Sequence, residues 1–137
     1  KKSASKYFRF ESNKLDYIGY KFGLGRKVTT DYSLWDECEK GKPSALRIMS
    51  KYCDQDVRLL EAVYLLMRPY IKPHPNLGLY INDNVQRCPS CGSDDITWSH
   101  IYHTYASAYT AFRCNNCQSL GKSRNKVKSC KTLSVAK

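Results

Sequence analysis

The sequence lacks any apolar run close to the roughly 20 residues that a membrane-spanning helix requires. It has no apolar signal segment, and its seven cysteines are an odd number, so they cannot all pair in disulfides within one chain. These absences argue against a membrane protein and against a secreted protein stabilised by disulfides. We therefore expect a soluble protein without membrane contact, in a reducing, intracellular and cytoplasmic environment.

Acidic residues are scarce, with 12 Asp and Glu against 23 Lys and Arg, which gives a formal net charge of +11. Residues 118–137 carry six Lys or Arg and no acidic residue. A basic excess concentrated at one end favours a polyanion such as nucleic acid as the partner. Charge alone leaves open a solvated surface or a disordered end, so this prediction depends on the motifs nearby.

Two Cys-x-x-Cys pairs are the most informative motif of the chain. They are Cys88 with Cys91 and Cys114 with Cys117, and each pair brings two thiolates close enough to share one tetrahedral metal ion. Two pairs complete a shell of four sulfurs, so we predict a structural zinc site. Two disulfides or four free thiols are the alternatives, and they suit two regular pairs less well. His100 and His103, between the pairs, are interpreted as strand side chains rather than zinc ligands.

The residues between the two pairs predict an antiparallel hairpin. Ile96 to His103 and Ala108 to Arg113 are rich in β-branched and aromatic residues. A hairpin of this size buries few side chains, so the metal must hold this zinc ribbon together.

Basic and aromatic residues in and after the hairpin are candidates for contacts with nucleic acid. Cations attract phosphates, and exposed rings stack on unpaired bases. The alternative for each ring is that it covers the small core of the ribbon. The candidate residues are Trp98, Tyr102, Arg113, Lys122, Arg124, Lys126 and Lys128.

The first half of the chain is predicted to be helical. Apolar residues recur at helical spacing from Leu15 to Phe22, and a second short helix is expected from about Ser33 to Gly41. The longest helix is expected from Ala45 to Met67, and its wide apolar surface predicts burial on more than one side. Prolines after this helix predict an extended connector from about Ile71 to Arg87.

These elements predict an α+β chain with three parts. We expect a helical domain at residues 1–84, a zinc ribbon at residues 85–121 and a disordered basic tail at residues 122–137. The boundary between the first two parts is placed near Val85. Three cysteines outside the motif are interpreted as buried or idle thiols, namely Cys38, Cys53 and Cys130.

Tyr52 and Asp56 lie four residues apart in the longest predicted helix, so their side chains share one face. An aspartate on a buried helix face is unfavourable unless it is paired or binds a metal. Asp54 lies on nearly the opposite side of the same helix. The spacing leaves two interpretations open: Asp56 faces solvent beside an ordinary core tyrosine, or the two residues form a site.

One part of this helix resembles the third motif of the proofreading-type DEDD 3′–5′ exonucleases, in the subgroup with tyrosine in that motif (DEDDy). The resemblance is carried by Tyr52-Cys53-Asp54-Gln55-Asp56-Val57 and by Arg68-Pro69-Tyr70. Residues 6–25 are similar to the segment before this motif in phage-type members, some of which also end in a zinc ribbon. The resemblance extends from Lys6 to about Arg124. It implies the helical C-terminal portion of an RNase H-like exonuclease domain, encoded by a phage in a bacterial host.

The resemblance also implies a role for two residues. In that family, four carboxylates hold two divalent metal ions that promote attack of water on the terminal phosphodiester. Asp56 would be the fourth carboxylate and would bind magnesium or manganese in the complete enzyme. Tyr52 would orient the attacking water.

The sequence departs from the family because it lacks the first two motifs, an Asp-x-Glu and a further aspartate. One catalytic carboxylate cannot hold two metal ions, so we expect the chain to be inactive alone. It begins at Lys1 without methionine, so we expect it to be completed by a missing N-terminal part or by a second chain. Two hypotheses follow. The chain is part of an exonuclease that acts on single-stranded ends, foremost of DNA, or it is a non-catalytic zinc-ribbon module that binds nucleic acid or a replication partner.

Overall fold

The computed structural model describes residues 2–129, and the chain divides into two compact units, Lys1–Ile71 and Lys72–Lys137. We call them the helical unit and the ribbon unit. Together they confirm the α+β class, with one long helix and one antiparallel sheet. Within residues 2–129, no helix has the length and apolar character needed to cross a lipid bilayer.

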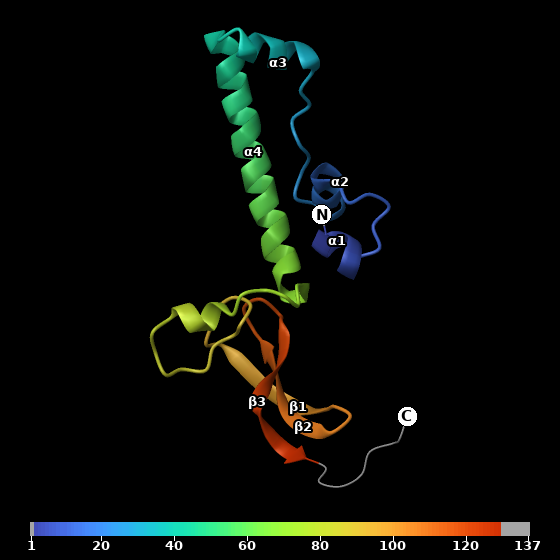
Figure 1. The fold of residues 1–137 in the computed structure, drawn as a ribbon, viewed down its shortest axis with the longest axis vertical. Coiled ribbons are helices and arrows are strands. Elements are labelled where there is room, and N and C mark those ends of the chain that lie inside the picture. The colour runs from blue at the N-terminus through green and yellow to red at the C-terminus, as the bar shows by residue number, and fades with distance from the viewer. Residues whose placement is uncertain (1, 130–137) are drawn as a thin grey trace. The chain divides into compact units, whose positions relative to one another are not determined.

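The helical unit contains the three helices that the sequence predicts and one short helix before them (Figure 1). The long helix begins at Pro43, which is favourable in the first helical turn because the missing N–H needs no partner there. Asp31 caps the N-terminus of the preceding helix, which begins at Tyr32, and Asp31 Oδ1 accepts a hydrogen bond of 3.0 Å from the Leu34 N–H. The elements are α1 (Lys2–Tyr7), α2 (Leu15–Lys21), α3 (Tyr32–Glu39), α4 (Pro43–Met67) and the 3-10 turn η1 (Arg68–Tyr70).

The core of the helical unit is small. Leu59, Val63 and Met67 on α4 pack with Ile18 on α2 and Ala4 on α1, and all five are buried. Aromatic rings extend this cluster, with stacked and edge-on contacts among three phenylalanines and a tyrosine. These rings belong to Phe8, Phe10, Phe22 and Tyr70.

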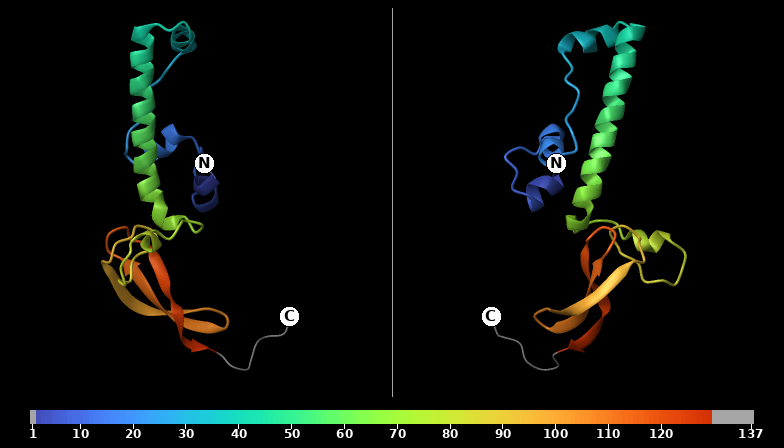
Figure 2. Two further views of the ribbon diagram at one scale, coloured as in Figure 1. Left: turned by 60° about the vertical axis from the view of Figure 1, so that its left-hand side comes forward. Right: turned by 180° about the vertical axis from the view of Figure 1, so that it is seen from behind.

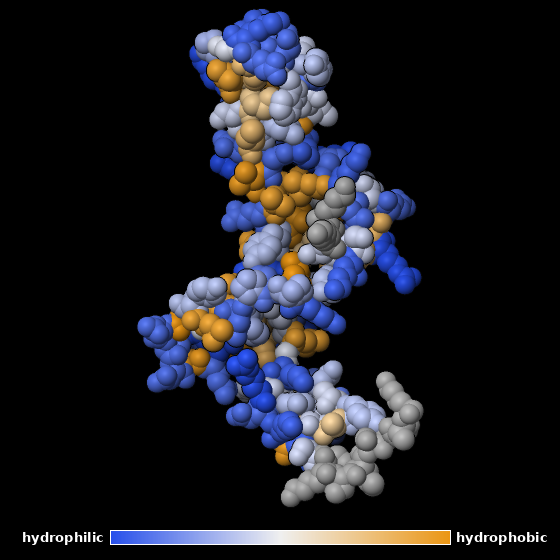
Figure 3. Space-filling model, viewed as in Figure 1, coloured by the Kyte–Doolittle hydropathy of each residue, from blue (hydrophilic) through white to orange (hydrophobic). Residues whose placement is uncertain are grey.

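The prediction that the long helix is buried on more than one side is wrong for the described residues. Large apolar side chains on the rest of α4 are open to solvent, including Val57 at 64 % and Leu60 at 56 % exposure. Figure 3 shows apolar patches in orange among the hydrophilic surface. The physical reason is that α1 and α2 are too short to cover more than one stripe of a 25-residue helix.

The ribbon unit is a three-stranded antiparallel sheet with strand order β1-β2-β3 (Figure 2). Strands β1 (Ile96–His103) and β2 (Ser107–Cys114) form the predicted hairpin. Strand β3 (Leu120–Ser129) pairs with the other edge of β2. The 3-10 turn η2 (Leu77–Tyr80) comes before the sheet.

Strand β3 corrects two predictions, because residues 122–129 are an ordered strand rather than a disordered tail, and the ribbon continues beyond residue 121. The backbone of β2 offers hydrogen-bonding groups on both edges, and β3 satisfies the second edge even though its side chains are mostly polar. Residues 130–137, including Cys130, lie outside the described residues.

The connector belongs with the ribbon. The Leu77 N–H donates a hydrogen bond of 2.8 Å to the Pro89 carbonyl. The Arg87 guanidinium pairs with the Asp83 carboxylate, and its NH1 donates to the Gly92 carbonyl at 3.0 Å. These bonds tie residues 77–87 to the first cysteine pair, so the sequence boundary between the units falls after Ile71 and not near Val85 as expected.

Candidate functional site

The four predicted zinc ligands come together. The Sγ atoms of Cys88, Cys91, Cys114 and Cys117 all lie within 4.8 Å of one another. Cys88 Sγ is 3.7 Å from Cys117 Sγ, and Cys91 Sγ is 3.6 Å from Cys114 Sγ. A disulfide would need about 2.05 Å, and all cysteines within residues 2–129 are free thiols. The arrangement could hold a metal ion such as zinc in a shell of four sulfurs.

The two loops that carry the cysteines repeat one hydrogen-bonding pattern. In the first loop, the Gly92 N–H donates to the Cys88 carbonyl at 2.8 Å, and in the second, the Gln118 N–H donates to the Cys114 carbonyl at 2.9 Å. Gly92 and Gln118 both have positive φ, 78° and 61°. The reversal at each loop points the two sulfurs of a pair toward a common centre, and Gly92 adopts it without steric strain.

Side chains also join the two loops to each other. The hydroxyls of Ser90 and Ser119 are both buried and lie 3.0 Å apart. Asn115 Nδ2 donates to Asp95 Oδ1 at 2.7 Å, and Asn116 Nδ2 lies 3.7 Å from Cys91 Sγ. Polar contacts therefore fix the second loop against the first, as a pre-formed ligand shell requires.

Burial disfavours thiolates at two of the four cysteines. It raises the pKa of the Cys88 and Cys117 thiols above the ordinary value. Burial acts the same way on Cys91, but hydrogen bonds from Ser93 and the neighbouring cysteines outweigh it and leave the Cys91 pKa lowered. A bound cation is what would stabilise four sulfurs as thiolates in this space.

Tyr52 and Asp56 also come together, around the side chain of Lys27. Lys27 Nζ lies 3.0 Å from the Tyr52 hydroxyl and 2.5 Å from Asp56 Oδ2. The hydrogen bonds to Asp56 and Tyr52 raise the pKa of Lys27. Asp56 Oδ1 is buried without a hydrogen-bond partner, whereas Asp54 is exposed. Asp56 therefore does not simply face solvent beside an unrelated core tyrosine: the two side chains share one environment around Lys27.

The segment that carries Lys27 is held at both sides. The Lys27 N–H donates to Asp16 Oδ1 at 2.9 Å, and Gln55 Nε2 donates to the Arg26 carbonyl at 3.0 Å. Gln55 is the residue before Asp56 on α4, so the same helix that presents the carboxylate also anchors the lysine.

The predicted nucleic-acid residues lie on or beside the sheet, but they do not form one cluster. Tyr102 lies near Lys122, whose Nζ is 5.5 Å from the Tyr102 ring centroid. Trp98 instead packs edge-on against buried Phe112, with ring centroids 5.4 Å apart. Arg113 reaches Gln118 Oε1 at 3.4 Å. The side chains of Arg124, Lys126 and Lys128 are exposed along β3.

Two contacts beside the predicted residues were not anticipated from the sequence, one made by Lys27 and one made by Tyr109. Lys27 lies 25 residues before Tyr52, and no spacing rule connects them. Tyr109 pairs directly with Tyr102, and Lys122 Nζ lies 3.6 Å from the Tyr109 ring centroid. The position of Tyr109 beside Tyr102 could have been predicted from the hairpin, because pairing His103 with Ala108 places Tyr102 opposite Tyr109.

Comparisons with protein-family models, with curated proteins and with solved structures gave no match. The case for a function therefore depends on the residues and their geometry.

Proposed function

We propose that this chain is the C-terminal part of a metal-dependent 3′–5′ exonuclease that acts on single-stranded nucleic-acid ends. The observation that carries the proposal is the convergence of the Tyr52 hydroxyl and the Asp56 carboxylate on one cation, the Lys27 ammonium. In the Tyr-x-x-x-Asp motif of the DEDDy exonucleases, the aspartate binds a metal ion and the tyrosine orients the attacking water, so the two side chains must face one common point. The RNase H-like origin of the helical unit is part of this proposal.

The residues present do not fit a complete centre of two metal ions. Within residues 2–129, the four cysteines are the one group of three or more candidate metal ligands, and Asp56 is in no such group. The magnesium or manganese ions of a complete enzyme would need further carboxylates, either from residues encoded before Lys1 or from a second chain. What these residues supply is narrower. Asp56 offers a buried, unpartnered Oδ1, and Tyr52 offers a hydroxyl that can orient a water.

The test has two steps. The sequence encoded before Lys1 is determined first, and the extended protein is then assayed for nuclease activity. We expect an Asp-x-Glu on an apolar strand there, and we expect the extended protein to shorten a 3′-labelled single strand in magnesium or manganese. Asp56→Asn should reduce this rate by about a hundred-fold or more, because the neutral amide is a poor ligand.

Asp54→Asn is the matched control, since Asp54 is exposed two residues away on the same helix. Its rate should equal that of the unchanged protein. The proposal is wrong if neither the sequence before Lys1 nor a second chain supplies an Asp-x-Glu, or if Asp56→Asn and Asp54→Asn behave alike. The described chain alone should show no cleavage.

A second candidate function is a non-catalytic module that binds nucleic acid or a replication partner through a zinc ribbon. The ion pair of Lys27 with Asp56 favours it, because this pair neutralises the carboxylate without a metal. Zinc fits the cysteine shell, since a tetrahedron with Zn–S bonds of about 2.3 Å has sulfurs about 3.8 Å apart. The cations of β3 would supply the contacts with phosphates.

Nucleic-acid binding by the ribbon has its own test, and it applies to both candidates. Lys126→Gln with Lys128→Gln should lower affinity for any sequence alike, and it should reduce the dependence of log K on log salt by about 0.7 for each lost phosphate contact on a single strand. Lys40→Gln with Lys42→Gln, two exposed lysines of the helical unit, is the charge-matched control. If both double variants showed the same dependence of log K on log salt, the lysines of β3 would not contact phosphates.

A further inference from the structure

We propose that one face of the ribbon sheet holds an unpaired nucleobase in a hollow beside the phosphate-binding lysines. This inference rests on the proposed binding of single-stranded nucleic acid by the ribbon, and it names the base-binding site. We call the surface the base face and define it by His100, Tyr102, Tyr109, Ala111, Lys122 and Lys126.

The strand register places these six side chains on one face. His100 of β1 lies opposite Ala111 of β2, and Ala111 lies opposite Lys122 of β3. Directly opposed residues in an antiparallel sheet point to the same side, so the three residues form one row across the sheet.

A second row runs beside the first. Tyr102 lies opposite Tyr109, and Tyr109 lies opposite Lys126, with the register of β2 and β3 shifting on both sides of this pair. His100 and Tyr102 are two residues apart on β1, as Tyr109 and Ala111 are on β2, so both rows lie on the same face. The contact of Lys122 Nζ with the Tyr109 ring at 3.6 Å agrees with this placement.

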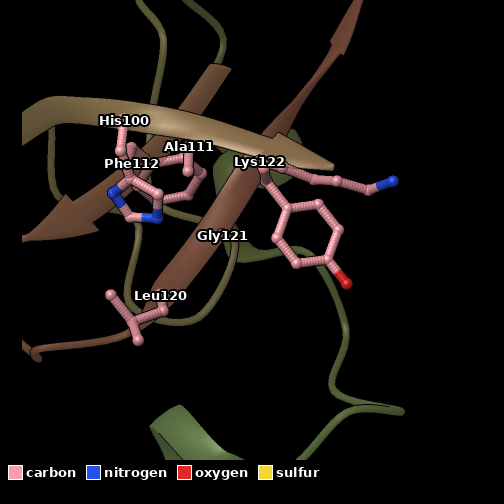
Figure 4. Close-up of a pocket in the computed structure, with 7 residues that line it drawn as sticks. His100, Ala111, Phe112, Leu120, Gly121 and Lys122 are labelled. Atoms are coloured by element: carbon pink, nitrogen blue, oxygen red, sulfur yellow. The ribbon is translucent and has the colours of Figure 1, made fainter. Parts of the chain in front are cut away.

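A cavity of about 330 Å³ opens on this face, because the central residue of the first row is a small alanine. Ala111 and Phe112 are buried and line the inner part, and His100, Leu120 and Lys122 project around it (Figure 4). Tyr102 also lines the cavity and is 48 % exposed. Flat rings beside an apolar floor are the surroundings that a nucleobase stacks on.

Close contact between β2 and β3 shapes the inner wall of this cavity. A Cβ atom at Gly121 would lie 2.4 Å from Phe112 Cε1, so the Phe112 ring occupies the space that a side chain would take there. Gly121 therefore lets the buried ring lie against β3.

Charge identifies the occupant as part of a polyanion. Lys122 and Lys126 belong to the face itself, and no Asp or Glu follows Asp95 in the sequence. A base that enters the cavity would carry its backbone phosphate toward these ammonium groups, whereas an apolar peptide would leave them unpaired. We therefore assign the cavity to a base of a single strand.

The experiment compares two labelled strands of equal length and charge on the zinc-loaded full chain, by fluorescence anisotropy. One is an oligothymidylate of about twelve nucleotides, and the other is the same strand with abasic sites. We expect the oligothymidylate to bind about ten-fold more tightly, because only this strand can stack in the cavity.

Three variants should abolish this preference and leave binding of the abasic strand unchanged. His100→Ala and Tyr102→Ala remove the rings at the cavity, and Ala111→Leu fills the cavity without changing any ring or charge. His103→Ala and Tyr105→Ala are the matched controls, since neither residue lines the cavity, and both should keep the preference. Zinc content and circular dichroism identify a variant that fails to fold. If Tyr102→Ala or Ala111→Leu fails to fold, the strand preference of His100→Ala tests the inference, because His100 is exposed on β1.

The outcomes separate this inference from the proposed function. No binding of either strand would refute nucleic-acid binding by the ribbon. Equal binding of both strands, or a preference that survives His100→Ala and Tyr102→Ala, would overturn the base site while phosphate binding stands. Displacement of the oligothymidylate by thymidine monophosphate at equal concentration would assign the cavity to free nucleotides and would overturn the assignment to a strand.

Discussion

The helical unit and the ribbon unit bury little, and they are stabilised by different means. The helical unit depends on a core cluster of five buried apolar residues and a set of phenylalanine rings, and it leaves much of the apolar surface of α4 exposed. Among the described residues of the ribbon unit, the buried apolar side chains besides cysteines are two alanines and one phenylalanine, and four sulfurs converge at one end. The first unit is therefore stabilised by the hydrophobic effect, whereas the second would be stabilised by a metal ion bound to its four sulfurs.

This difference matters for function. A metal-clamped sheet can expose rings and lysines, because its stability does not depend on burying them. The exposed rings and lysines of the proposed base face are an example. Among its described residues, the helical unit has no comparable ligand cluster, and it combines exposed apolar side chains on α4 with buried polar atoms that lack a hydrogen-bond partner. The unpaired atoms include Tyr7 Oη, Asn13 Oδ1 and Asp56 Oδ1.

Metal removal should separate the two units most clearly. A strong zinc chelator should unfold residues 88–129, because binding energies of about 10–16 kcal/mol exceed the whole stability of a typical small domain. Helix α4 should keep its amide-exchange protection, since no cysteine of the cluster lies in the helical unit. Hydrogen exchange with and without chelator measures both effects. Unchanged protection in β1 and β2 would contradict the assigned role of the metal.

Truncation of the buried stripe of α4 should give the next largest effect, and only in the helical unit. Leu59→Ala should reduce the free energy of unfolding of that unit by about 2–5 kcal/mol, because it leaves a cavity between α4 and α2. Leu60→Ala removes the same atoms from an exposed neighbour and should cost less than about 0.5 kcal/mol. Urea unfolding followed at the helical band, with the zinc site intact, gives both values. Equal losses would mean that the exposed side of α4 is covered in solution.

The sequence predicts the ribbon hairpin well, because local signals and the metal motif agree there. Strands β1 and β2 and the four-sulfur cluster lie where the cysteine spacing and the β-branched residues place them. The sequence predicts disorder for residues 122–129 of β3, because Lys122 to Lys128 show charge and no apolar alternation. Its pairing comes from the free edge of β2, which is a property of the sheet and not of the β3 sequence.

Long-range contacts explain the other differences. The face shared by Tyr52 and Asp56 follows from helical periodicity, but their contact with Lys27 depends on how the segment after α2 returns to α4. Periodicity also shows that α4 is apolar on several sides, and it cannot show what covers them. Burial depends on the neighbours that the chain supplies, and the short helices α1 and α2 cover only one stripe.

Loss of Lys27 should have a smaller effect, again confined to the helical unit. Lys27→Met should lower the free energy of unfolding by about 1 kcal/mol, because Asp56 then keeps a partly buried charge without its partner. Lys51→Met, an exposed lysine of the same helix α4, is the matched control and should change little. Since the folded-state pKa of Lys27 is raised, its contribution is complete below the unfolded pKa near 10.5 and is lost as the pH rises through the folded value. A difference from the control that persists unchanged at strongly alkaline pH would contradict the ion pair.

The smallest effect should appear in acid, where the two units titrate through different groups. The ribbon loses its metal as the thiolates are protonated, whereas the helical unit is affected at the cap of α3. Hydrogen bonds from the Leu34 N–H and the Ser33 hydroxyl lower the pKa of Asp31. A lowered folded-state pKa means that the contribution of Asp31 is complete above its unfolded pKa and is lost as the pH falls through the folded value.

Asp31→Asn keeps an oxygen that can cap the helix but does not titrate, so the stability of the helical unit should vary less with pH below about 4. Thermal unfolding of both proteins, followed at the helical band from neutral to acidic pH, measures the difference. Parallel curves would show that acid acts on the helical unit through carboxylates other than the α3 cap.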